Sequence, residues 1–134
     1  MRLLWVTAGG IALVTFLFSV AVEFIGFPVV YNRGVAFGVR LPEPFQTIAI
    51  LAALTIVIYL GLHTRNRWEA FGFGSIIGGA CANSIDRLID GVVTDMFRVG
   101  IFPVFNAADA AITVGVILVL WVSGREGLKN LFTK

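Results

Sequence analysis

The sequence predicts an all-α membrane protein, a bundle of four transmembrane helices with a small extracytoplasmic β-hairpin. Of its 134 residues 58% are hydrophobic and 13% are charged, whereas soluble domains carry about 25% charged residues. A chain this short has too much surface to hide so many apolar residues in one core, so lipid is the simplest solvent for the remainder. The composition also excludes intrinsic disorder, which needs low hydrophobicity and high net charge. We expect a single domain over residues 1–134.

Four apolar segments have about the length that a membrane helix needs, at residues 3–22, 45–62, 70–87 and 102–122. A spanning helix takes about 20 residues. The third segment fits this length only if its last turn includes Asp86 and Arg87. The first segment could instead be a cleaved signal peptide, but its apolar run is longer than usual and three more such segments follow. We therefore interpret it as a membrane helix.

The loop at about residues 24–40 has a different pattern. Residues 27–31 and 35–39 are β-prone runs, and the sequence Asn32-Arg33-Gly34 between them is typical of a turn. These features predict the hairpin, at the outer membrane surface.

The orientation follows from the basic residues and the tryptophans. Six of the ten Lys and Arg residues fall on the side that holds both termini, and cytoplasmic loops are enriched in these residues. Trp5, Trp68 and Trp121 fall at the same predicted interface, as an aromatic belt would. We expect both termini in the cytoplasm.

Polar residues at membrane depth invite a functional hypothesis. Here they gather at the predicted outer helix ends and in the outer loops: Asn32, Asn83, Asp86, Arg87, Asp90, Asp95, Asn106 and Asp109. Asp95 lies in an apolar loop and Asp109 in the first turn of the fourth helix. If the two meet, they form an aspartyl dyad that shares one proton. The ionised carboxylate can then activate water while the protonated one polarises a carbonyl.

A structural interpretation competes with the dyad. Asn106 and Asp109 fit a helix N-cap, with an acid near the positive end of the helix dipole. Asp95 could be a solvated loop acid, and Asp86 with Arg87 an interfacial ion pair. On the residues alone, the cap-and-loop interpretation ranks slightly ahead of the dyad.

Other chemistries are disfavoured. The single cysteine, Cys81, excludes an internal disulfide and a structural zinc site, and the single histidine, His63, lies at the opposite helix end. The sequence contains no metal-ligand spacing, no glycine-rich phosphate loop and no basic run. We therefore expect no cofactor, no metal and no nucleic-acid partner. Gly74 and Gly78 are spaced as a face for close helix packing.

Four segments resemble motifs of the lipoprotein signal peptidases (signal peptidase II), in order between about Tyr31 and Val122. Residues 32–38, N-R-G-V-A-F-G, resemble N-x-G-x-A-F, and residues 78–87, G-G-A-C-A-N-S-I-D-R, resemble G-G-A-x-G-N-x-x-D-R. Residues 91–96, G-V-V-T-D-M, resemble G-x-V-V-D-F, and residues 105–109, F-N-A-A-D, match F-N-x-A-D. Four motifs in register make the resemblance specific.

The resemblance implies a membrane aspartyl endopeptidase in the bacterial cytoplasmic membrane, with Asp95 and Asp109 as its catalytic pair near the outer face. Asp86 would be a supporting residue. Six residues would shape the site and hold substrate: Asn32, Gly34, Asn83, Arg87, Asn106 and Ala108. The implied substrate is a diacylglyceryl-modified prolipoprotein, cut just before its lipidated cysteine, with membrane lipids as the other partner.

The sequence departs from the family pattern mainly in its first helix. Family members usually carry a D-Q-x-x-K-type motif there, whereas residues 3–22 hold no charge. Ala82 replaces a glycine and Thr94 a valine. Two alternatives remain: a non-catalytic relative that binds lipoproteins or a partner helix, and a proton or ion pathway. The pathway would need a polar chain toward the cytoplasm, which helices 1 and 2 lack.

Overall fold

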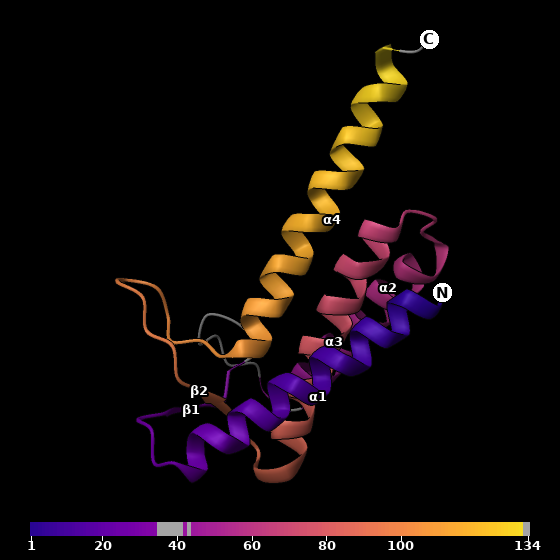
Figure 1. The fold of residues 1–134 in the computed structure, drawn as a ribbon. Coiled ribbons are helices and arrows are strands. Elements are labelled where there is room, and N and C mark those ends of the chain that lie inside the picture. Colours follow the sequence, from indigo (N-terminus) through magenta and orange to yellow (C-terminus); the bar gives the residue numbers. More distant parts are fainter. Residues whose placement is uncertain (35–41, 43, 133–134) are drawn as a thin grey trace.

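The computed structural model describes residues 1–34, 42 and 44–132, without the side chains of 127–132. Four helices and one two-stranded sheet make up this part of the chain (Figure 1). The helices are α1 (Arg2–Phe24), α2 (Phe45–His63), α3 (Arg67–Asp90) and α4 (Ala107–Phe132), and the strands are β1 (Val30–Asn32) and β2 (Val93–Asp95). The predicted mainly helical fold with a small antiparallel sheet is confirmed.

Helix α3 lies at the centre of the bundle, because α1 and α4 both pack along it (Figure 1). Glycines on α3 allow this close approach. A Cβ atom at Gly78 would lie 2.5 Å from the Ala8 carbonyl oxygen of α1. A Cβ atom at Gly79 would lie 2.5 Å from the Ala108 carbonyl oxygen of α4. Glycine therefore brings the first turn of α4 against the middle of α3, which positions the site described below.

Three helices in the described residues are long and apolar enough to cross a membrane: α1, α2 and Ala107–Glu126 of α4. All three expose large apolar side chains such as Val14, Ile56 and Leu120, each more than half exposed. Helix α3 is not among them by composition, and many of its residues are buried. A helix that is covered by its neighbours does not need a lipid-compatible surface all round.

The two strands pair antiparallel, with Val30 opposite Asp95 and Asn32 opposite Val93. The hairpin predicted within residues 24–40 differs from this pairing. Its second arm, residues 35–39, lies outside the described residues, and the first arm pairs with β2, far along the chain. Gly91, in the left-handed conformation with φ +80°, ends α3 and turns the chain into β2.

Helix α2 contacts the bundle mainly at its C-terminal end. A Cβ atom at Gly61 would lie 3.0 Å from Leu4 of α1 and from Phe73 of α3. Ile48 and Leu51, nearer the start of α2, are more than half exposed. At this same end of the bundle, Asn66 Nδ2 donates a hydrogen bond to Glu126 Oε1 (2.6 Å), which links the α2–α3 connection to α4. The bundle is thus held together at one end and hollowed at the other.

Candidate active site

Strand β2 places Asp95 inside the protein, where 1% of its surface is exposed. Its two carboxylate oxygens each accept a hydrogen bond from a side-chain amide. Asn32 Nδ2 donates to Oδ2 at 3.0 Å, and Asn106 Nδ2 donates to Oδ1 at 3.1 Å. The interpretation of Asp95 as a solvated loop acid is therefore wrong, because its backbone belongs to a buried strand.

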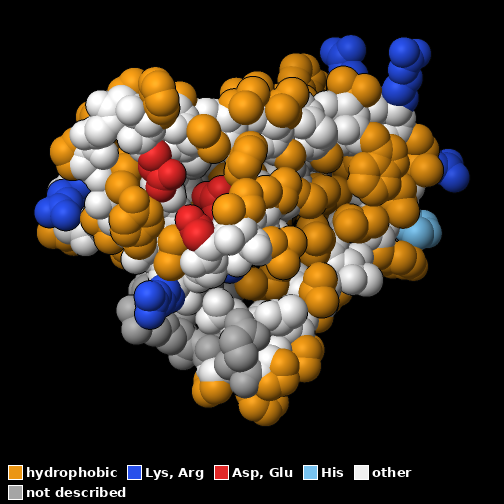
Figure 2. All heavy atoms as spheres, turned by 90° about the horizontal axis from the view of Figure 1, so that it is seen from below, with side chains coloured by type: hydrophobic (Ala, Val, Ile, Leu, Met, Phe, Trp, Pro, Cys, Tyr) orange, Lys and Arg blue, Asp and Glu red, His pale blue; other side chains and the backbone are white. Residues whose placement is uncertain are grey.

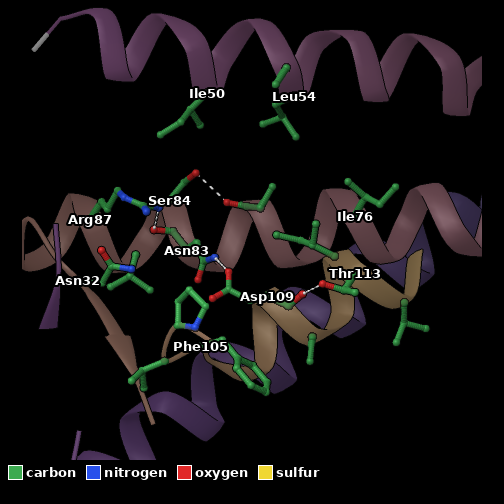
Figure 3. Close-up of a pocket in the computed structure, with 18 of the residues that line it drawn as sticks. Asn32, Ile50, Leu54, Ile76, Asn83, Ser84, Arg87, Phe105, Asp109 and Thr113 are labelled. Carbon is green, nitrogen blue, oxygen red and sulfur yellow. Dashed lines mark hydrogen bonds between the residues drawn. The ribbon is translucent and has the colours of Figure 1, made fainter. Parts of the chain in front are cut away.

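Asp109 lies in the first turn of α4, and Asn106 caps that helix. The Asp109 backbone N–H donates to Asn106 Oδ1 (2.8 Å), and the Asn106 backbone N–H donates to Asp109 Oδ2 (3.3 Å). This reciprocal pair has the geometry of a capping box, in which two orphan N–H groups of a helix start find acceptors. Asn83 Nδ2 of α3 donates to the remaining oxygen, Asp109 Oδ1, at 2.8 Å (Figure 3).

Asn106 connects the two aspartates. Its Nδ2 donates to Asp95 Oδ1 and, at 2.9 Å, to Asn83 Oδ1, while its backbone N–H donates to Asp109. Asn106 is 1% exposed and Asn83 8% exposed, so this network is shielded from solvent. The cap and the meeting of the two acids are therefore not alternatives, since the same asparagine does both.

The surroundings of Asp95 favour its protonated form. Burial raises the pKa of its carboxyl to about 6, and the hydrogen bond from Asn32 opposes that rise. The negative charge of Asp109 raises the pKa further, whereas Asn106 and the Arg87 guanidinium lower it. A carboxyl whose pKa is raised by burial and by a like charge is typical of paired acids at functional sites.

Arg87 holds the end of β1 against α3. Its Nη2 donates to the Gly34 carbonyl oxygen at 2.7 Å, and its Nη1 donates to the Asn83 carbonyl oxygen at 3.2 Å. The Gly34 N–H in turn donates to Asn32 Oδ1 (2.8 Å). Gly34 therefore contributes through its backbone, and the chain of contacts orients the Asn32 amide toward Asp95.

Two of the predicted residues do not join this network. Ala108 is 4% exposed, and its carbonyl packs against Gly79. The Asp86 carboxylate interacts with the Thr94 backbone and lines a separate small cleft with Glu23 and Asp90.

Two polar contacts of the structure were not predicted from the sequence. Thr94 Oγ1 donates to Glu23 Oε1 at 2.7 Å, which links the end of α1 to β2. Gln46, 7% exposed, donates to the Arg33 carbonyl oxygen at 3.4 Å. A signal existed for Glu23, because it is the first charge after a long apolar run. Gln46 is likewise a polar residue at the start of an apolar helix.

A groove of about 1050 Å³ opens beside Asp109, between α2, α3, α4 and the loop before α4. Its polar end is formed by Asn32, Asn83, Arg87 and Asp109, and Ile50 and Leu54 of α2 face it from across the opening (Figure 3). Most of the other lining residues are apolar, including Val57, Ile76, Val99, Phe102, Phe105 and Ile112. The groove can hold a long apolar ligand with one polar region at the acids.

This arrangement can support acid–base chemistry. Two carboxylates share one asparagine neighbour, the pKa of Asp95 is about 6, and an apolar groove leads to Asp109. In the part of the chain that the structure describes, no group of three or more His, Cys, Asp or Glu side chains could hold a metal ion.

Comparison with solved structures places this fold among bacterial membrane enzymes. One such enzyme, solved at 2.3 Å resolution, matches 91% of this chain and 87% of its own, with a TM-score of 0.79 and 22% identity. A second, solved at 1.9 Å, matches with a TM-score of 0.71 and 25% identity, over 87% of this chain and 91% of its own. Fold and site thus define a mainly helical protein that is similar in fold to these membrane enzymes and that joins two acids through one asparagine.

Sequence comparison is more specific. The family model described as "Signal peptidase (SPase) II" matches residues 4–124. The lipoprotein signal peptidase of Aquifex aeolicus is 38% identical over 133 residues, which cover 88% of this chain and 80% of that protein. The lipoprotein signal peptidase of Chlorobium luteolum is 35% identical, over 77% of this chain and 71% of its own. The chain belongs to the signal peptidase II family, which confirms the resemblance found in its motifs.

Proposed function

We propose that this protein is an aspartic endopeptidase that removes the signal peptide from diacylglyceryl-modified prolipoproteins, just before the lipidated cysteine. The observation that carries the proposal is the pair Asp95 and Asp109, both hydrogen-bonded to Asn106, with Asp109 lining the polar end of the groove. Family membership supports the peptidase activity, and the aspartic mechanism follows from the chemistry of the two acids.

In the proposed reaction the pair carries one proton and one negative charge. The ionised carboxylate takes a proton from a water molecule as the water oxygen attacks the carbonyl carbon of the scissile bond. The protonated carboxyl donates its proton to the carbonyl oxygen, which gives a neutral tetrahedral diol. When the diol collapses, the C–N bond breaks and the leaving nitrogen receives the proton that came from the water. One diol hydroxyl returns a proton to the other carboxylate as the new carbonyl forms, so the pair again holds one proton. The pair titrates as a unit, so neither role is assigned to one residue.

The amides would hold the two acids in a fixed arrangement for this chemistry. Each of the four carboxylate oxygens accepts a hydrogen bond from an asparagine amide or backbone N–H, and each keeps lone-pair capacity for water. Preorganised groups of this kind stabilise charge without rearranging during the reaction. Asn32, Asn83 and Asn106 are therefore site-shaping residues, and Arg87 and Gly34 orient Asn32.

The groove suits a substrate that stays in the membrane. Its walls are mostly apolar, and they include residues of α2 and α4, two helices that expose apolar residues. A lipid-modified peptide could reach the acids from the bilayer while its acyl chains remain among apolar side chains.

We also propose that all four helices span the bacterial cytoplasmic membrane, with both termini inside and the acids near the outer face. Helix α3 has 24 residues and lies between α1 and α4, so its length is sufficient for a span of about 20 residues. Fusions of a reporter enzyme to the α2–α3 connection and to the loop before α4 test this arrangement. A cytoplasmic signal for the first and an external signal for the second are expected, and the reverse would contradict it.

The decisive experiment uses purified protein in detergent and a synthetic lipidated precursor peptide. We expect the wild type to cut the peptide, and Asp95→Asn and Asp109→Asn each to reduce the rate by at least about 10³-fold, since an amide neither accepts the water proton nor supplies one. Asp90→Asn, at an exposed acid outside the network, should retain activity.

Each of the other outcomes points to a different reading. Cleavage by both aspartate variants would refute the pair. A folded wild type that binds the peptide without cutting it would favour the non-catalytic relative. Loss of activity on addition of a chelator would contradict a metal-free mechanism. A proton or ion pathway is not favoured by the family match.

A further inference from the structure

We propose that Glu23, at the end of α1, is a positioning residue that holds the strand carrying Asp95 in place through Thr94. The inference rests on the proposed function only for its kinetic readout, since the contacts that carry it are structural. Glu23 Oε1 accepts the hydroxyl hydrogen bond of Thr94 at 2.7 Å, and Thr94 is 4% exposed. This bond joins two elements that are 71 residues apart in the chain.

Thr94 interacts with two helices. The Asp86 carboxylate of α3 interacts with the Thr94 backbone, and Glu23 of α1 accepts the hydrogen bond of the Thr94 hydroxyl. Glu23, Asp86 and Thr94 line the same small cleft between the ends of α1 and α3. Acidic side chains gather in one small area of this end, which is otherwise largely hydrophobic (Figure 2).

The geometry of a strand passes this restraint on to Asp95. Successive side chains of a strand point to opposite faces, so Thr94 faces Glu23 while Asp95 faces Asn32 and Asn106. A shift of the backbone at Thr94 therefore moves the Asp95 carboxylate relative to its amide donors. Errors of about 1 Å in such geometry can lower a rate about 100-fold.

The sheet alone gives this strand little support. β2 has three residues and pairs only with β1 in the described part of the chain, and an isolated pair of strands is marginally stable in water. Helix α1, which has no charge over residues 3–22, thus ends in a carboxylate that contributes to the site without contacting the reacting groups.

The test compares four single variants in the full-length protein. Glu23→Ala removes the acceptor, Thr94→Val removes the donor, and Glu23→Gln keeps an acceptor oxygen without the charge. Asp90→Asn is the matched control, because it removes an acidic charge from the same cleft without contacting the Thr94 hydroxyl. For each protein we measure kcat and KM on the lipidated precursor, and hydrogen–deuterium exchange at residues 92–96.

We expect Glu23→Ala and Thr94→Val each to lower kcat about tenfold with little change in KM, and to increase exchange at residues 92–96. Glu23→Gln should restore most of both, and Asp90→Asn should match the wild type. The double variant Glu23→Ala/Thr94→Val should lose no more kcat than either single variant, because both substitutions remove the same hydrogen bond.

Unchanged exchange and a kcat within twofold of the wild type in Glu23→Ala would overturn the inference while leaving the proposed peptidase intact. Additive losses in the double variant would overturn it too. If the wild type proves inactive, the proposed function fails. The exchange data alone then show whether Glu23 restrains β2.

Discussion

Asn106 is the residue whose replacement most sharply tests the site, because it caps α4 and bridges the two acids. Asn106→Ala removes the acceptor for the Asp109 N–H and the donor to Asn83 Oδ1 and Asp95 Oδ1. Asn106→Ser removes the same donor but keeps a side-chain oxygen that can cap the helix. Comparing the two variants separates the effect of the helix cap from the effect of the hydrogen bonds that the Asn106 amide donates.

The magnitudes follow from these contacts. Losing a helix cap costs about 1 kcal/mol, and leaving a buried acceptor without its donor costs about 1–3 kcal/mol. Asn106→Ala leaves two such acceptors, so its free energy of unfolding should fall by at least about 3 kcal/mol. Asn106→Ser should be more stable than the alanine variant by about 1 kcal/mol. Both variants should lose about ten- to hundredfold in kcat, since a hydrogen bond to a charged group is worth about 1.5–3 kcal/mol.

The assay combines unfolding in mixed micelles, followed by tryptophan fluorescence, with cleavage of the lipidated precursor. A serine variant with kcat within twofold of the wild type would refute the claim that the Asn106 amide positions Asp95. Equal stabilities of the serine and alanine variants would refute the cap.

Three further predictions concern pH, packing and β1. The pKa of Asp95 lies near 6, above its usual value of 3.8, so the folded state holds that proton more tightly than the unfolded state. The free energy of unfolding should therefore fall, by about 2 kcal/mol, as pH rises from 4 to 6, and thermal melts of Asp95→Asn should lack most of this slope. Gly79→Val should destabilise the protein by about 2 kcal/mol or more, because its Cβ would meet the Ala108 carbonyl at 2.5 Å; Gly124→Ala, with nothing within 4 Å, should not. Arg87→Lys should lower kcat/KM about tenfold, since one ammonium group cannot reach both the Gly34 and Asn83 carbonyls; equal kinetics would contradict the role of the guanidinium.

The local parts of the site could be predicted from the sequence, because helix geometry fixes them. A spacing of four residues puts Asn83 and Arg87 on one face of α3, and Arg87 indeed donates to the Asn83 carbonyl. A spacing of three puts Asn106 and Asp109 within reach of each other at a helix start. These contacts involve neighbours along one helix, so no knowledge of the tertiary fold is needed.

The contacts between distant segments could not be predicted in the same way. Asn32 reaches Asp95 across 63 residues, and β1 pairs with β2, whereas turn chemistry around Asn32 predicted a partner within residues 35–39. Register between two short strands depends on how α1 and α3 place them, and neither strand's pattern encodes that placement. The groove could not be predicted from the sequence either, because it depends on how α2, α3 and α4 are placed relative to one another.

The coincidence of cap and acid pair has a physical consequence for how the site is built. Asp109 is fixed by the first turn of α4, an element held against α3 by close packing at Gly79. Asp95 is fixed on a short strand, whose hold on the bundle depends on side chains from other segments. Asn106 joins the two, since its backbone serves Asp109 and its side chain serves Asp95. Asp109 is thus held by a rigid helix, and the position of Asp95 relative to it depends on the contacts that hold β2. Changes in these contacts should alter activity more readily than they alter overall stability.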